Sequence, residues 1–272
     1  MFSAFLFTSY LYWDGKQEKT VHCWCIFLRQ MVGSSYCCVK YLENHSELLD
    51  FLVVCYGSKD IALNCGNMLR ESIKFSSLAK YILDSTSFEL FFKYVVLPNF
   101  DVAFDAFATF KDLLTKHEIA VSEFLTAHYE DFFEHYEKLL TSENYVTRRQ
   151  SLKLLSDFLL ETPNSYIMKR YILEVRYLKV MMTLLKDSSK NIQISAFHFF
   201  KVFVANPNKP LEIIVILAKN HVRLLTLLRN LFVDKSARGR AIRSGKRNDY
   251  EGNTQNILLT KLGVLGSSST TI

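Results

Sequence analysis

A pattern of one small residue followed by bulky apolar residues returns at a nearly constant interval along this chain. The small residues are Cys65, Ala106, Ser151 and Ala196, which open the runs CGNML, AFATF, SLKLL and AFHFF. The intervals between them are 41, 45 and 45 residues. Helical repeats of the armadillo and HEAT kinds have periods of about 40–47 residues, because each unit needs a neighbour to cover its apolar face. The interval therefore predicts stacked helical repeats, whose surfaces bind other macromolecules.

The composition favours the same architecture, an all-α armadillo/HEAT-like helical repeat solenoid. Hydrophobic residues make up 49% of the 272 residues, and 9 Gly and 4 Pro leave long stretches without a helix breaker. In the second repeat, Ala103, Ala106, Phe107 and Phe110 have the spacing of one helix face. Each repeat helix is expected to have one apolar partner helix. These partners are predicted over residues 78–96, 121–140, 167–185 and 211–231.

The charge of the chain is concentrated near its end. The formal net charge is +6, and residues 233–272 contribute seven basic and three acidic residues to it. This segment is also rich in Gly, Ser and Thr, a composition that buries too little apolar surface to fold, so we expect a disordered basic tail. The remainder is nearly balanced, whereas nucleic-acid-binding domains carry a concentrated basic footprint. No nucleic-acid partner is expected.

The cysteines do not form a recognisable metal or disulfide pattern. All six precede Gly66, in apolar helical contexts, which indicates reduced thiols and a cytoplasmic protein. His22, Cys23, Cys25, Cys37 and Cys38 match no common zinc spacing, and no EF-hand loop is present. We expect neither metal nor cofactor. The apolar stretch 2–13 is too short to span a bilayer, so no membrane association is expected.

Signatures of catalysis are missing from the sequence as well. It contains no nucleophile elbow, no protein-kinase signature and no Gly-rich dinucleotide loop. The sequence therefore predicts a protein that is not an enzyme.

Cations gather in the third and fourth repeats. Arg149 and Lys153 are four residues apart and so share a helix face. If Lys179 and Lys219 reach the same groove, it would suit an extended acidic peptide, with Met182 as an apolar floor. The alternative is that these are ordinary solvated side chains. The candidate cations of this region, beside the aromatic residue Tyr145, are Arg148, Arg149, Lys153, Lys169, Arg170, Arg176, Lys179, Lys186 and Lys219.

Four segments closely resemble the calcium-binding protein 39 family, also called mouse-protein-25-like or Hym scaffold proteins, and plant members in particular. The segments are DIALNCG at 60–66, AFATFKDLLT at 106–115, ENYVTRRQSLKLL at 143–155 and FVANPNK at 203–209. The likeness runs from about residue 17 to residue 232. It predicts an armadillo-like domain over 17–232, between an unmatched segment 1–16 and the tail 233–272.

The resemblance implies a non-enzymatic scaffold or adaptor that binds and activates sterile-20-like protein kinases or pseudokinases. Family members take a Trp-Glu-Phe tripeptide of the partner in a groove. By resemblance Arg149, Lys179 and Met182 line that groove, with Tyr145, Lys153 and Lys219 as neighbours on the binding surface.

Three departures from the family leave an alternative open. The N-terminal repeats of full-length members are expected to be missing, and the basic tail is expected to replace the family's acidic terminal helix. Phe104 stands where a small polar residue is usual in the family. The alternative is a truncated paralogue that acts as a kinase-independent protein-interaction module or has no function. The sequence does not indicate an oligomeric state.

Overall fold

A computed structural model describes residues 17–238, with side chains described over 20–231. The chain divides into two compact units, and each is treated by itself. The N-terminal unit holds residues 1–139 and 161–164, and the C-terminal unit holds residues 140–160 and 165–272.

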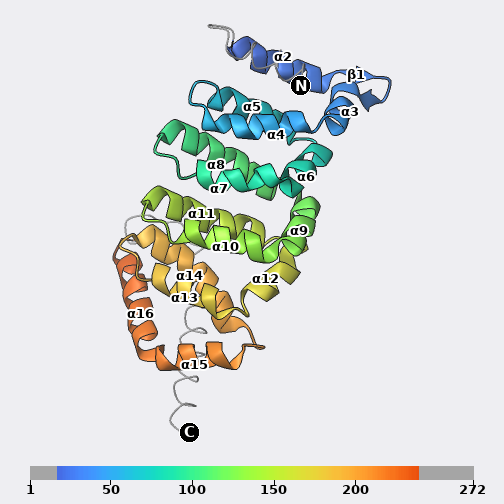
Figure 1. The fold of residues 1–272 in the computed structure, drawn as a ribbon. Helices are drawn as coiled ribbons and strands as arrows, with labels where there is room; N and C mark the ends of the chain where they lie inside the picture. The colour runs from blue at the N-terminus through green and yellow to red at the C-terminus, as the bar shows by residue number, and fades with distance from the viewer. Residues whose placement is uncertain (1–16, 239–272) are drawn as a thin grey trace. The chain divides into compact units, whose positions relative to one another are not determined.

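The N-terminal unit is built from short helices that follow one another closely, with one two-stranded hairpin (Figure 1). Gly33, with φ of +64°, sits in the turn of that hairpin. The elements are α2 (Gln17–Arg29), β1 (Met31–Val32), β2 (Ser35–Tyr36), α3 (Cys37–Asn44), α4 (Glu47–Val54), η1 (Cys55–Gly57), α5 (Ala62–Ser72), α6 (Ser76–Asp84), η2 (Thr86–Glu89), α7 (Leu90–Tyr94), α8 (Phe100–Thr115), α9 (Glu118–Ala127), α10 (Tyr129–Leu140) and η3 (Thr162–Asn164).

Within the described part of the C-terminal unit, 140–160 and 165–238, the regular elements are helices joined by short turns. Its helices are α11 (Tyr145–Leu159), α12 (Ser165–Tyr171), α13 (Val175–Leu184), α14 (Lys190–Ala205), α15 (Leu211–Lys219) and α16 (His221–Arg238). The predicted all-α helical repeat fold is confirmed, because within residues 17–238 helix follows helix and the strands are limited to the short hairpin β1–β2 between α2 and α3.

The recurring small residues lie where the long first helices of the repeats pack together. Cys65 of α5 and Ala106 of α8 are fully buried, and α5 packs against both α2 and α8. In the C-terminal unit, Ser151 of α11 and Ala196 of α14 are also fully buried, and α11 packs against α14. A small side chain allows the two helix axes to approach closely, which explains why the pattern has the period of the repeat.

The prediction of one partner helix per repeat is wrong, since each predicted partner is divided into two or more helical segments. Residues 78–96 form α6, η2 and α7, and the later partners divide into α9 and α10, α12 and α13, and α15 and α16. Ser85 ends α6 with an extended backbone, and Asp50 of α4 accepts hydrogen bonds from the Ser85 and Ser87 hydroxyls. Three of the divisions lie at Ser85, His128 and Asn220. No Gly or Pro is adjacent to these residues, and the apolar pattern of the sequence continues across them, so the pattern gave no sign that a helix ends there.

Asparagine side chains cap two of the long first helices, α8 and α11. The Asn99 side chain caps α8 by accepting from the Val102 N–H, and the Asn144 side chain caps α11 by accepting from the Val146 and Thr147 N–H groups. An Asn at this position satisfies a backbone donor that the helix itself leaves without a partner.

Helix α16 reaches beyond residue 232, where the repeat domain is predicted to end. Helix α16 continues to Arg238, six residues into the predicted tail, because no helix breaker occurs in the sequence before Gly239. The rest of the predicted tail and the predicted segment 1–16 lie outside the described residues.

Within residues 17–238, none of the helices combines the length and the apolar character that crossing a bilayer requires.

A buried polar network joins η1, α5 and α8. The Tyr56 hydroxyl donates to Asp105 Oδ2 over 2.8 Å, and Arg70 Nη2 lies 2.7 Å from Asp105 Oδ1. Arg70 Nη1 also donates to Thr109 Oγ1 over 2.9 Å. Burial, together with the Asp105 charge, raises the pKa of Tyr56 well above its ordinary value, so the phenol stays protonated and remains a donor.

Gly66 is the residue that leaves room for this network. A Cβ atom there would lie 1.9 Å from Asp105 Oδ2 and 2.3 Å from the Tyr56 hydroxyl. We expect Gly66→Ala to lower the free energy of unfolding by about 1–3 kcal/mol, because the intruding methyl group must displace a paired buried carboxylate.

The matched control is Gly57→Ala, whose Cβ would meet only the Tyr94 hydroxyl at 3.9 Å. Urea denaturation of both variants measures the difference. Equal stability of Gly66→Ala and Gly57→Ala would show that the network adjusts without cost.

Candidate partner-binding surface

Three of the predicted binding residues form one stripe on α11. Tyr145, Arg149 and Lys153 are four residues apart and all exposed. The opposite face of α11 is buried through Ser151, Leu155 and neighbouring apolar residues. The packed face fixes the helix, so the stripe is presented to solvent on a rigid element.

Tyr145 lies close to the start of α14. Hydrogen bonds with the Ser189 and Asn191 side chains, and also the charge of Arg149, lower the pKa of Tyr145 from its ordinary value. Tyr145 is 40% exposed, and a tyrosine side chain offers a partner both an apolar ring and a polar hydroxyl group. The first turn of α11 and the start of α14 therefore belong to the same surface region.

The neighbouring Arg148 has a different role from Arg149. Its side chain is only 17% exposed, and both Nε and Nη2 lie 3.0 Å from Asp187 Oδ2. Its Nη1 also donates to the backbone carbonyls of Ser142 and Glu143, and Asp187 accepts from the Ser189 N–H. Arg148 thus ties the start of α11 to the turn between α13 and α14.

Two further predicted residues share one face of α13. Lys179 is exposed and Met182 is half-buried, three residues further along the helix. Tyr177, Leu178 and Met181 are buried, and the helix packs on α14. Met182 therefore presents part of an adaptable apolar side chain beside a cation, as the groove hypothesis requires.

The last predicted residue, Lys219, is exposed at the end of α15, which packs against α13. The structure brings Tyr145, Arg149 and Lys153 together on one helix face, and Lys179 and Met182 on another. Helices α11 and α13 both pack on α14. That the two faces and Lys219 line one groove stays a prediction.

Arg176 belongs to the same group of cations, but its contacts are within the protein and stabilise the fold. Its Nε donates to Glu174 Oε2 over 2.8 Å, and its guanidinium lies 4.6 Å from the centre of the buried Tyr177 ring. Sequence spacing gave no means of separating Arg148 and Arg176 from the exposed cations, because their partners are set by the packing.

We expect Arg148 and Arg149 to respond differently to substitution. Arg148→Ala should lower the free energy of unfolding by about 2–4 kcal/mol, since it leaves the Asp187 carboxylate, 9% exposed, without its guanidinium. Arg149→Ala should change it by less than about 0.5 kcal/mol, as is usual for an exposed position.

Thermal or urea unfolding of the two variants measures this contrast, and each is the control for the other. Equal losses of stability would contradict the division between an inward and an outward arginine.

Among residues 17–238, no group of three or more His, Cys, Asp or Glu side chains is arranged to hold a metal ion.

Comparison with known proteins decides the family. The model of the Mo25-like family matches residues 6–246, a range that covers most of each unit. The chain belongs to the Mo25-like family. The matched range extends beyond both ends of residues 17–232, over which the sequence alone showed the resemblance.

Curated relatives from distant organisms share the family. A calcium-binding protein 39-like protein of Mus musculus is 51% identical over 215 residues, which are 79% of this chain and 64% of the relative. A putative MO25-like protein of Arabidopsis thaliana is 50% identical over 208 residues, covering 76% and 61%. A Mo25-like protein of Schizosaccharomyces pombe is 45% identical over 208 residues, covering 76% and 63%. The chain thus spans less than two thirds of the length of these relatives.

Proposed function

We propose that this Mo25-like chain is a non-enzymatic cytoplasmic scaffold that binds sterile-20-like protein kinases or pseudokinases and favours their active conformation. Part of the binding would use a surface on α11, α13 and α15 for a partner peptide that ends in Trp-Glu-Phe. Membership of the Mo25-like family supports the scaffold role.

The exposed stripe of Tyr145, Arg149 and Lys153 carries the proposal for the peptide site. A peptide with a C-terminal carboxylate and a glutamate needs cations that are not already paired within the fold. Arg148 is engaged with Asp187, but Arg149 and Lys153 are exposed. Arginine can hold a carboxylate through two parallel hydrogen bonds, which makes Arg149 the stronger candidate of the two.

The half-buried Met182 would supply the apolar part of the same recognition. A thioether packs well against aromatic rings, and the peptide offers two of them. Lys179 would sit one helical turn away and attract the glutamate. In this arrangement the aromatic residues of the peptide would be the anchor, and cations of the scaffold would surround them. A few central residues carry most of the binding energy in interfaces of this kind.

Activation would follow from a shift of the conformational equilibrium of the kinase. A scaffold shifts that equilibrium only as far as its affinity differs between the active and inactive conformations. A tenfold difference in affinity is worth about 1.4 kcal/mol. The chain would therefore contribute no chemical group to the reaction, and would act by stabilising one conformation of its partner.

Titration of a fluorescent peptide ending in Trp-Glu-Phe tests the peptide site. We expect saturable binding to the full chain. Arg149→Glu together with Lys179→Glu should weaken it at least about tenfold, because two attractive contacts become repulsive. Met182→Ala should weaken it by a similar factor through the lost apolar contact, which is a loss of about 1–2 kcal/mol in binding free energy.

The control variant is Lys169→Glu, which reverses an exposed charge on α12, a helix outside the proposed surface on α11, α13 and α15. A scrambled peptide controls for charge alone. If a folded double variant binds the peptide as tightly as the unchanged chain, the assignment of the surface is wrong. Loss of binding in the Lys169 variant as well would indicate attraction by net charge and not a site.

A further inference from the structure

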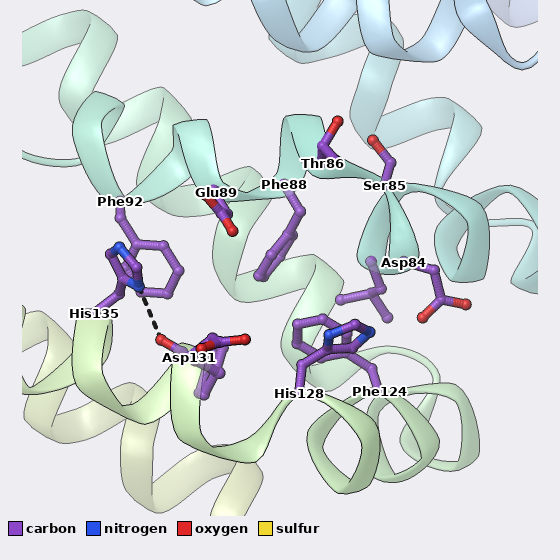
Figure 2. A pocket seen from close by; sticks show the side chains of 12 residues that line it. Asp84, Ser85, Thr86, Phe88, Glu89, Phe92, Phe124, His128, Asp131 and His135 are labelled. Carbon is purple, nitrogen blue, oxygen red and sulfur yellow. Dashed lines mark hydrogen bonds between the residues drawn. The ribbon is translucent and has the colours of Figure 1, made fainter.

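A small cavity lies within the N-terminal unit, between the segment of η2 and α7 and the segment of α9 and α10 (Figure 2). Its volume is about 110 Å³. Ligand sites for drug-sized molecules are usually about 300–1,000 Å³, so this cavity has room for a single side-chain head group. It is lined by Leu83, Asp84, Ser85, Thr86, Phe88, Glu89, Phe92, Phe124, His128, Asp131, Phe132 and His135.

Aromatic rings form the floor of the cavity. Phe88, Phe92, Phe124 and Phe132 are all at least 91% buried. The Phe88 ring centre lies 5.0 Å from that of Phe124, and the Phe92 ring centre lies 5.7 Å from that of Phe132, both in edge-to-face geometry. These contacts hold the rings in fixed positions, so the floor of the cavity is rigid and aromatic, and aromatic rings attract a cation that approaches their faces.

The rim of the cavity is acidic. Asp84, Glu89 and Asp131 are exposed and come from three different elements or their ends, while neither Lys nor Arg is among the lining residues. Figure 2 shows Asp84 and Asp131 on opposite sides of the opening, with Glu89 above Asp131. The charge of the rim therefore complements a cation and repels an anion.

The two histidines extend the aromatic wall. The His128 ring centre lies 5.2 Å from that of Phe124, and the His135 ring centre lies 5.3 Å from that of Phe92. The Asp131 carbonyl can only accept, so His135 Nδ1, at 2.8 Å, must be the donor. This bond holds the His135 ring against Phe92 and in a fixed orientation. The arrangement does not assemble a metal site within the described residues.

We propose that this cavity binds an arginine side chain from an extended segment of a partner protein. A guanidinium group is planar, stacks on aromatic faces and is more weakly hydrated than an ammonium group, so it loses less on entering an aromatic cavity. Its N–H groups can reach the carboxylates of the rim while its plane rests on the phenylalanine rings. The proposal adds a second contact point to the scaffold role, in a different unit from the peptide surface.

The test uses N-acetyl-arginine methylamide as the probe and NMR of the full chain labelled with ¹³C at histidine Cε1. Saturable shifts are expected at His128 and His135 and not at His22 or His45, with a dissociation constant on the order of 10 mM for so small a probe. The lysine analogue should bind about threefold more weakly, and the neutral glutamine analogue should cause no shift.

Asp131→Asn combined with Glu89→Gln should weaken the arginine probe at least about threefold, since two exposed carboxylate contacts are lost. Glu134→Gln is the matched control, because Glu134 is an exposed carboxylate of the same helix α10 that does not line the cavity. The proposal is overturned by the absence of localised shifts up to about 50 mM probe, by equal shifts with the glutamine analogue, or by unchanged binding in the double variant. The probe does not involve the C-terminal unit, so this result is independent of the Trp-Glu-Phe titration.

Discussion

Close packing of the first helices of successive repeats is the constraint on which the fold depends. Cys65 and Ala106 in one unit, and Ser151 and Ala196 in the other, are fully buried on these helices. A repeat of this kind cannot cover its apolar face alone, so its stability comes from the contact with its neighbour. Gly66 shows how little space remains, since even one methyl group would overlap the Tyr56–Asp105 pair.

The same packing determines which polar residues are available to a partner. On α11, Ser151 faces inward and Arg148 is held by Asp187, whereas Tyr145, Arg149 and Lys153 lie on the exposed face. Adjacent arginines in one helix thus have separate roles, one in the fold and one in the proposed binding. Because the inward residues fix the helix, the outward ones are pre-organised, which lowers the entropy cost of binding a peptide.

Sequence reasoning predicted the features that depend on local pattern. The repeat period, the all-α fold and the shared helix face of Arg149 and Lys153 follow from spacing and residue type. It missed the division of each partner helix, because the break at Ser85 depends on Asp50, 35 residues earlier. The aromatic cavity was missed for the same reason, since α7 and α10 each appear as ordinary amphipathic helices.

The claim that α11, α13 and α15 line one site can be tested most directly by photo-cross-linking. The partner peptide would carry benzoylphenylalanine in place of the phenylalanine of Trp-Glu-Phe, and the attachment points on the full chain would be mapped by mass spectrometry. Attachment at Met182 and on the Tyr145–Lys153 face of α11 is predicted. Attachment confined to residues 17–139, or to α13 without α11, would contradict a single site on these helices.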